Sequence, residues 1–579
     1  MIDRFSFRLL LLILAIASVS SPGGYSQQTD PYLRETGGFG YKLYSGNAIN
    51  IWWCEGAYKI MHDTPVPVNQ GDTIRIWSAG NEYESFQVII SSEKRSDRVR
   101  SGITPLKDAN GNSWPGEMES RKVEYLYVSK PTDSYGYTGW WPDPLPLLDG
   151  PFDVMGGENS TIWFNLFTPQ GTEPGDYRGA VTVSMNGKDI SLPVKLTVWN
   201  FTLPETPSVR SGIGLSVDKI AAYHNLVTFK EKELTYDLYM EAFRKYRIAP
   251  YYFQALAPVK DTITGLYWRG GLYDAENARS GDFSLRVEDD NPSYTVYSEY
   301  LLPVRVLSNQ EYNLEWDAMT GEQDQQFCIL AEGYDADGKY LVFENRMEVF
   351  KGTGKWKKYS YNIGKPGYEV AYIKIKLFPV LSTEQGELVG ETWFDNISLT
   401  EGKSATNLVT QGDFEVDVDS IKIELDFSSF DRAAERYLDN FGFNSFRIDL
   451  RGLGSGTYYS RKEGIFAGFR QGPEQYNLLM DSYLGQIESH LESRGWLEKA
   501  YVYWFDEPSK QDYPFVREGM ETIKRGAPAL PALLTENDPG PEIMDVTDIT
   551  CTIWHRIDPA KARKVTGEGN QYWSYLYRP

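Results

Sequence analysis

The stretch YVYWFDEP at residues 501–508 decides the fold predicted for the second half of the chain. Its uninterrupted apolar and aromatic residues predict a strand at residues 500–505 that is buried on both faces, as in a parallel sheet. Two acids, Asp506 and Glu507, follow this strand directly. In a β/α barrel the carboxyl ends of the strands open into the active site. The two acids therefore fall where such a fold carries its chemistry.

Strands and helices alternate on both sides of this stretch. The predicted strands lie at residues 209–216, 250–256, 444–450, 500–505, 532–535, 548–554 and 571–577, and the predicted helices at 230–247, 428–440, 474–494 and 514–525. Ser428 is a plausible helix N-cap. The alternation predicts parallel β/α units. Since a closed barrel needs eight strands, we expect a (β/α)8-type barrel truncated after strand 7, with a missed strand as the alternative.

Two β-rich regions lie outside the β/α units. Short alternating runs separated by turn sequences such as Asn-Gly predict an N-terminal β-sandwich over residues 30–205. A second group of short strands interrupts the β/α pattern, and it predicts an inserted β-sandwich or jelly roll at residues 262–402. The barrel would then consist of residues 206–261 and residues 403–579.

Composition excludes several classes of protein. The formal net charge of -22 disfavours nucleic acid as a partner, because the field of the chain repels phosphate backbones. Only four histidines are present, without an HExxH motif, and the three cysteines are widely spaced. A metalloprotease, a zinc knuckle and a disulfide framework are therefore not indicated. An aromatic content of 14% fits sugar stacking and an aromatic-rich sandwich equally well.

Residues 1–26 have the order of residues typical of an export signal. Arg4 and Arg8 precede an apolar run at residues 9–19, which is shorter than a membrane span, and small residues follow. We therefore expect a secreted, periplasmic or cell-surface protein, with an uncleaved anchor as the alternative. No later segment is apolar and long enough to span a bilayer, so no membrane span is expected after signal removal.

The adjacency of the two acids restricts the mechanism. Burial beside aromatic residues would raise the pKa of one carboxyl group and keep it protonated as a general acid. Enzymes with two opposed carboxylates hold them ~5–9.5 Å apart, and neighbours on one strand end rarely flank both faces of a sugar. The pair fits better a reaction in which the 2-acetamido oxygen of the substrate attacks the anomeric carbon. Asp506 would orient that amide and stabilise the charged intermediate, and Glu507 would act as acid and then as base. A solvated acidic turn is the alternative.

Several motifs resemble those of glycoside hydrolase family 123 and its broader, uncharacterised relatives. They lie at residues 81–87, 426–450 and 501–541, and the most specific is DEP at 506–508 followed by DYPFV at 512–516. The resemblance covers the N-terminal sandwich and the barrel but not the insertion. It implies an exo-acting, substrate-assisted β-N-acetylgalactosaminidase with Asp506 as the stabilising residue and Glu507 as the acid/base. It implies no cofactor for catalysis.

The later strand ends supply candidates for substrate binding. LLTE at 533–536 and YWSY at 572–575 look like strand ends of that family. His555 follows a predicted strand end, although a hydrogen-bonded structural role is the alternative. The predicted substrate-binding residues are Trp504, Glu536, His555, Trp573 and Tyr575.

The insertion resembles a carbohydrate-binding module of the jelly-roll type. The resemblance rests on SGDFSLRV at 280–287, GKWKKY at 354–359 and WFDNISL at 393–399. In such modules an acid at the position of Asp395 often helps to hold a structural Ca²⁺. A sandwich with no ligand is the alternative.

Three functions are compatible with these patterns, and each has a glycan as the partner. The first is an exo-glycosidase that acts on terminal β-linked N-acetylhexosamine, in particular N-acetylgalactosamine. The second is a non-catalytic glycan-binding protein with a degenerate barrel. The third is a glycosidase for a different sugar, in which Asp506 or Glu507 works with a distant acid such as Asp449 or Glu536.

Overall fold

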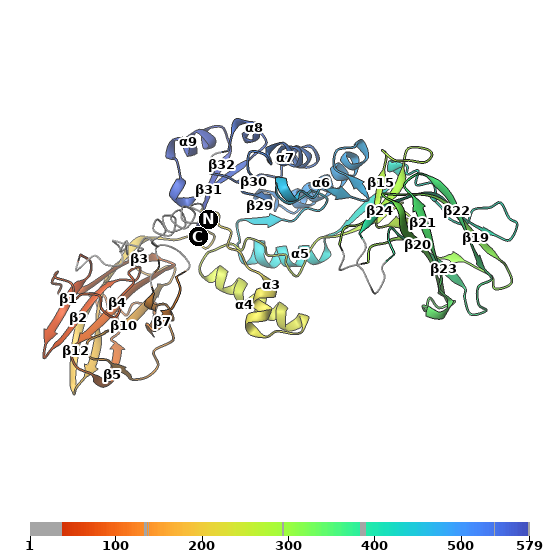
Figure 1. Ribbon diagram of the computed structural model, residues 1–579. Coiled ribbons are helices and arrows are strands. Elements are labelled where there is room, and N and C mark those ends of the chain that lie inside the picture. Colours follow the sequence, from red (N-terminus) through yellow and green to blue (C-terminus); the bar gives the residue numbers. More distant parts are fainter. Residues whose placement is uncertain are drawn as a thin grey trace, which may run out of the picture. The chain divides into compact units, whose positions relative to one another are not determined.

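The computed structural model describes residues 38–576, except 132–135, 137, 292–294, 382–388 and 538. The chain forms two compact units that divide after Glu205, and each is described by itself (Figure 1). The predicted export signal at residues 1–26 lies outside the described residues. None of the helices in the described ranges is both long and apolar enough to span a membrane.

The first unit is a sandwich of two five-stranded sheets (Figure 1). One sheet has the order β1 (Tyr41–Gly46), β2 (Ile49–Glu55), β4 (Glu82–Ser92), β10 (Asn159–Thr168) and β6 (Glu117–Lys122). The other has the order β3 (Ile74–Gly80), β12 (Lys188–Thr202), β11 (Gly175–Met185), β5 (Ser96–Ile103) and β9 (Phe152–Val154). A ribbon of β7 (Tyr125–Val128) and β8 (Gly139–Pro142) accompanies them. The N-terminal β-sandwich predicted from alternation is confirmed.

The second unit begins with two helices, α3 (Val217–His224) and α4 (Phe229–Lys245). The predicted helix at residues 230–247 is confirmed as α4. It starts at a capping box, in which the Thr228 side chain accepts from the Glu231 N–H and the Glu231 carboxylate accepts from the Thr228 N–H.

The strands predicted at residues 209–216 and 250–256 are wrong as regular strands. The described residues there form one isolated parallel bridge, between Ile213 and Pro250. Pro250 has no N–H to donate, and Ile213 is 46% exposed, so neither segment gains a full ladder. The backbone still continues the sheet direction, because the Tyr251 N–H donates to Ile213 and the Arg447 N–H donates to Tyr251.

The insertion is a second β-sandwich (Figure 1). Its larger sheet has the order β14 (Trp268–Arg269), β17 (Ser298–Tyr300), β23 (Tyr372–Phe378), β20 (Gln323–Tyr334) and β21 (Arg346–Thr353), with β18 (Val304–Arg305) also paired to β23. Its smaller sheet has the order β15 (Leu272–Asp274), β16 (Ser284–Asp289), β24 (Gly390–Glu401), β19 (Tyr312–Thr320) and β22 (Lys357–Gly364).

The two strands that connect the insertion to the rest of the unit lie side by side. β13 (Lys260–Thr264) pairs antiparallel with β25 (Lys422–Asp426). The residues after 402 still pack on the sandwich, because the Gly412 carbonyl accepts from the Ile397 N–H and Phe414 is fully buried against Trp268. The insertion therefore ends at β25, later than the predicted residue 402. The residues after 402 lack strand alternation, so the sequence did not indicate that they pack on the sandwich.

A parallel sheet forms the centre of the remaining part. It contains β26 (Phe446–Ile448), β29 (Ala500–Asp506), β30 (Ala532–Thr535), β31 (Ile549–Ile553) and β32 (Gln571–Tyr575), paired in chain order. Helix α5 (Ser428–Ala434) precedes β26, and the helices between successive strands are α6 (Glu474–Ser493), α7 (Tyr513–Gly526), α8 (Pro541–Met544) and α9 (Pro559–Gly567) (Figure 1). Five of the seven predicted barrel strands are thus confirmed. Among the described strands β26 and β32 are the two edges of an open sheet, so a closed barrel is not what these residues form.

The start of α5 differs from the prediction. Ser428 is the first helical residue, and the N-cap position is held by Phe427. The carboxylate of Asp426 accepts from the Ser428 N–H at 2.8 Å. The acid at the end of β25 thus satisfies the N–H of the first helical residue.

Candidate active site at the end of β29

Strand β29 carries the two acids to the edge of the sheet. Val502 and Phe505 belong to the large core, whereas Tyr501 and Tyr503 belong to a separate aromatic cluster. The register with β30 is irregular between Tyr503 and Asp506, which ends the strand. Glu507 then adopts a φ of 41°, in the left-handed region that non-glycine residues rarely occupy.

Two hydroxyl groups hold Asp506 by one of its oxygens. Oδ1 accepts from the Tyr503 hydroxyl at 2.6 Å and from the Thr535 hydroxyl at 2.8 Å. The two hydroxyl oxygens also lie 3.1 Å from each other. Oδ2 has no hydrogen bond to any residue that the structure describes. Burial raises the pKa of Tyr503, and the hydrogen bond to Asp506 raises it further, so Tyr503 stays a donor.

Glu507 is held from the other direction. The Tyr575 hydroxyl on β32 donates to Glu507 Oε1. The Glu507 N–H donates to the Thr535 hydroxyl at 3.1 Å, which ties its backbone to β30. Burial raises the pKa of Tyr575, and the hydrogen bond to Glu507 adds to the rise.

Both acids are exposed to solvent. The expectation that they are buried beside aromatic residues is therefore wrong. They lie at and just beyond the last residue of the strand, where the flanking sheet no longer covers them. Their environment consists of hydroxyl donors rather than an apolar wall.

An aromatic cluster lies beneath the acids on the same face of the sheet. It packs Tyr501 with apolar residues of β30 and β31 and with the partly buried Trp573 and Tyr575. The Trp573 ring meets Tyr501 edge to face, with centroids 5.2 Å apart, and its indole N–H donates to Gln571 at 3.0 Å. The structure thus places Tyr575 beside Glu507 and Trp573 in the aromatic cluster beside Tyr501.

Trp504 packs against the large core and not in this aromatic cluster, and its role in substrate binding stays a prediction. Its indole N–H donates to the Gly454 carbonyl at 2.6 Å, and its ring packs against Phe515 with centroids 5.4 Å apart. A Cβ atom at Gly519 of α7 would come within 2.3 Å of the ring. The alternation of side chains along β29 puts this residue among the helices instead.

Glu536 and His555 follow strands on the same edge of the sheet. Glu536 comes directly after β30, is half-buried, and accepts from the Asn537 N–H at 2.8 Å. His555 follows β31 in a short 3-10 turn, Trp554–Arg556, and is exposed. Both stay candidates for substrate binding by their position at this edge of the sheet.

Sequence analysis missed an arginine on the neighbouring strand. Arg447 of β26 donates to the Tyr251 hydroxyl at 2.8 Å and forms an ion pair with Asp449. Its guanidinium lies 4.5 Å and 5.2 Å from the ring centroids of Tyr251 and Tyr252, and its buried Nε has no hydrogen-bond partner. The alternation of Phe446, Arg447, Ile448 and Asp449 was the available signal, since it puts both charges on the face opposite the core.

Two further residues were missed because their role depends on the fold. Tyr503 and Thr535 supply the hydroxyl groups that fix Asp506. Each lies in a strand that looked entirely structural, and Thr535 is one residue before the predicted Glu536.

Asp395 on β24 does not fit a Ca²⁺ ligand. It is fully buried, and its two oxygens accept from the backbone N–H groups of Arg279, Ser280 and Asn396 at 2.7–3.1 Å. Calcium needs six to eight oxygen ligands, whereas these N–H dipoles point their positive ends at the carboxylate. Within the described ranges no three His, Cys, Asp or Glu side chains are grouped to hold a metal ion. Burial raises the pKa of Asp395 to about 6.

Residues 416–578 match the family model "Glycoside hydrolase 123, catalytic domain", and this range includes β26, the two acids and β32. No curated protein matches the chain.

Solved structures show weak likeness. A family 123 glycoside hydrolase from Clostridium perfringens, described for glycolipid glycan hydrolysis, has 11% identity and a TM-score of 0.48, over 92% of this chain and 72% of that chain. The CBM22-1 xylan-binding domain from Paenibacillus barcinonensis has 16% identity and a TM-score of 0.19, over 24% of this chain and 87% of that chain. A family 30 carbohydrate-binding module from Clostridium thermocellum has 12% identity and a TM-score of 0.18, over 26% and 93%. By this match, residues 416–578 are similar to the glycoside hydrolase family 123 catalytic domains.

Proposed function

We propose that this glycoside hydrolase removes terminal β-linked N-acetylhexosamine, in particular N-acetylgalactosamine, from the ends of glycans by substrate-assisted, retaining catalysis. One observation carries the proposal. Two adjacent acids end one strand, and hydroxyl groups from β29, β30 and β32 hold them in different orientations. The mechanism uses these side chains and the acetamido group of the substrate, and it needs no cofactor.

Asp506 is suited to orient the acetamido group. Its Oδ1 is occupied by two hydroxyl donors, which fix the rotation of the carboxylate. Oδ2 is left to accept from the acetamido N–H. That contact directs the acetamido oxygen toward the anomeric carbon and stabilises the positive charge that develops on the amide.

Glu507 is suited to move the proton. In the first step the acetamido oxygen bonds to the anomeric carbon, the bond to the leaving oxygen breaks, and Glu507 gives its proton to that oxygen. In the second step water bonds to the anomeric carbon, the bond to the acetamido oxygen breaks, and Glu507 takes a proton from the water. The Tyr575 hydroxyl holds Glu507 through both steps.

The aromatic cluster offers the apolar surface that a pyranose ring needs. Trp573 and Tyr575 lie partly exposed on the face that carries the acids. The C–H face of a sugar stacks on such rings while its hydroxyl groups reach polar side chains.

The alternative glycosidase mechanism, with a distant acid, has less support. Asp449 is already paired with Arg447, and Glu536 accepts from the N–H of Asn537. An acid engaged in this way is less available as a nucleophile or base toward the anomeric carbon.

Matched aryl glycosides test the proposal directly. Hydrolysis of the aryl N-acetyl-β-galactosaminide with no hydrolysis of the aryl β-galactoside supports substrate assistance, because the two differ only in the 2-acetamido group. A thiazoline derived from the N-acetyl sugar is expected to inhibit competitively. Equal rates on both substrates would assign the reaction to an opposed pair of acids, and no hydrolysis of any aryl glycoside would favour a non-catalytic glycan-binding role.

We also propose that the protein acts outside the cytoplasm, as a secreted, periplasmic or cell-surface enzyme. The proposal rests on the order of residues 1–26. Expression in a host that exports proteins, followed by N-terminal sequencing of the exported material, is expected to find a start between residues 21 and 28. Retention of Met1 would contradict a cleaved signal.

A further inference from the structure

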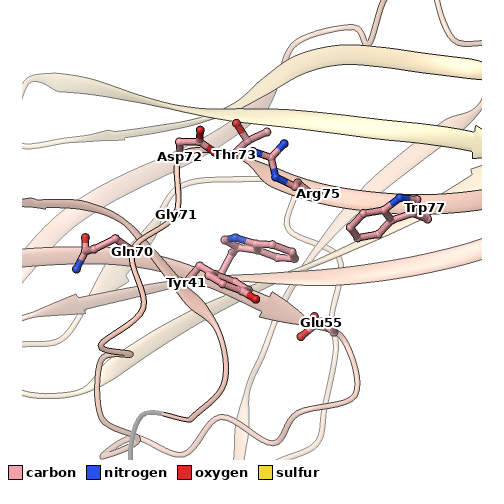
Figure 2. A pocket seen from close by; sticks show the side chains of 9 residues that line it. Tyr41, Glu55, Gln70, Gly71, Asp72, Thr73, Arg75 and Trp77 are labelled. Atoms are coloured by element: carbon pink, nitrogen blue, oxygen red, sulfur yellow. Dashed lines mark hydrogen bonds and ion pairs between the residues drawn. The ribbon is translucent and has the colours of Figure 1, made fainter.

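The first unit has a pocket at one edge of its sandwich, where no sequence motif predicted a site. The pocket has a volume of about 580 Å³, within the usual range of ligand sites, about 300–1,000 Å³. It lies between β1 and β2 of one sheet and β3 of the other, with the loop at residues 70–73 between them. Figure 2 shows Tyr41 and Glu55 facing Arg75 and Trp77.

Backbone hydrogen bonds hold the loop at the edge of this pocket against β1. β1 and β3 are the edge strands of their sheets. The loop closes the β1 edge, because the Lys42 N–H donates to Asn69 and the Gly71 N–H donates to Lys42, both at 2.9 Å. A Cβ atom at Gly71 would come within 2.9 Å of Tyr41, so glycine permits this close approach.

Two aromatic rings of the pocket are open to solvent. Trp77 is 48% exposed and Tyr41 is 42% exposed. Tyr41 stacks on the buried Trp53 with centroids 5.7 Å apart, which holds its ring in place. On β3, Trp77 follows the buried Ile76 and therefore stands on the outer face of the sheet. The pocket thus presents two oriented apolar faces.

Polar side chains surround these rings with both donors and acceptors. Glu55 offers carboxylate oxygens, Gln70 and Thr73 can donate and accept, and Arg75 donates to Asp72 at 2.8 Å. A phosphate group is disfavoured, because the one arginine is already paired and two carboxylates line the pocket. A cation is disfavoured by Arg75. Sugar hydroxyl groups suit this lining, because each can donate and accept at once.

We propose that this pocket binds a saccharide chain, in a unit other than the one that carries the acids of β29. A sugar ring stacks on Trp77, and its hydroxyl groups bond to Glu55 and Arg75. The site would hold a glycan independently of the hydrolysis of its end. This inference does not depend on the proposed function.

Affinity electrophoresis of the full chain tests the proposal. Native gels would contain xylan, galactan, glycol chitin or mucin as the probe, with polylysine as a cationic probe. We expect at least one of the four glycan probes to retard the wild type, and Trp77→Ala to weaken that binding ~10-fold or more, as loss of a central aromatic contact does. Glu55→Gln preserves the shape of the side chain and is expected to weaken binding as well, which covers the case in which Trp77→Ala does not fold.

Trp140→Ala is the matched control. Trp140 is 51% exposed on β8 of the same unit and does not line the pocket. Its loss is expected to leave retardation unchanged, and Trp77→Ala is expected to leave aryl glycoside hydrolysis within ~2-fold of the wild type. Retardation of Trp77→Ala and Glu55→Gln equal to that of the wild type would overturn the proposal. So would retardation by polylysine alone, or no retardation by any of the glycan probes.

Discussion

The acids at the end of β29 and the acid on β24 of the insertion are held in opposite ways. Asp506 and Glu507 are exposed and accept from hydroxyl groups of side chains on three strands. Asp395 is fully buried and accepts from three backbone N–H groups. The first arrangement fixes a carboxylate but leaves an oxygen available to another molecule. In the second arrangement Oδ2 fastens the Arg279–Ser280 backbone to β24, and Oδ1 accepts from the adjacent Asn396 N–H.

The comparison shows what separates an acid for chemistry from an acid for structure. All three come within two residues after a Trp-Phe pair, at Trp393-Phe394 or Trp504-Phe505, so their sequence neighbours are similar. The donors differ, because side-chain hydroxyl groups can rearrange around a substrate, whereas backbone N–H groups belong to the fold. Removal of each acid is therefore expected to affect a different property.

The largest effect is expected for Glu507→Gln. Loss of the general acid/base is expected to lower kcat on a natural oligosaccharide ~10²–10⁴-fold. The loss is expected to be smaller with aryl leaving groups that need little protonation. Because Glu507 is exposed, the unfolding midpoint should not change. Glu518→Gln on α7, another exposed acid, is the control. Wild-type rates for a folded Glu507→Gln variant would remove Glu507 from the mechanism.

The second largest effect is expected for Asp506→Asn. Its kcat is expected to fall ~10²–10³-fold, as on removal of one group that stabilises a transition state. The loss is expected to be the same for good and poor leaving groups, since the acid acts on the acetamido group and not on the leaving oxygen. A series of aryl N-acetyl sugars with leaving groups of different pKa measures this. A loss that grows with leaving-group pKa would exchange the roles of Asp506 and Glu507.

Tyr575→Phe sharpens the comparison, because it removes only the hydroxyl donor to Glu507. A hydrogen bond to a charged group contributes about 1.5–3 kcal/mol, so kcat is expected to fall ~10-fold or more. The neighbouring Tyr572→Phe is a matched control, because the Tyr572 hydroxyl is buried without a hydrogen-bond partner. Equal effects of the two substitutions on kcat would show that Tyr575 acts only through packing.

Asp395→Asn is expected to change hydrolysis least, by less than ~2-fold, but to change the pH dependence of stability. The pKa of Asp395 is raised by burial from 3.8 to about 6 in the folded chain. Its contribution to the free energy of unfolding is therefore fully present below about pH 4. That contribution, on the order of 3 kcal/mol, is lost as the pH rises through about 6.

Thermal unfolding of wild type and variant between pH 4 and 7 measures this contribution. The decrease of the unfolding midpoint with rising pH should be smaller for Asp395→Asn than for the wild type. Asp337→Asn changes an exposed acid in a turn of the same sandwich and is expected to keep the slope of the wild type. Identical slopes for all three proteins would assign the pH dependence to other groups.

Much of the secondary structure was determined by local pattern. The sandwich strands, helices α4, α6 and α7, and strand β29 with its two acids follow from alternation, helical spacing and an apolar run that ends in charge. Each of these patterns spans only a few neighbouring residues, so the elements can be predicted without knowing any distant contact. The segments at 209–216 and 250–256 were mistaken because a strand requires partners on its edges, which alternation cannot supply.

The composition of the two sites was decided by tertiary structure. Tyr575 reaches Glu507 across 68 residues of sequence, and Thr535 reaches Asp506 across 29, through the register of parallel strands. Alternation along β29 turns Trp504 toward α7, and Asp506 at the end of the strand is exposed to solvent. The pocket between Tyr41 and Trp77 exists only because two edge strands of different sheets meet. Sequence alone determined which residues carry charge and aromatic surface, and folding determined which of them share a face, because that depends on strand register and on how sheets pack.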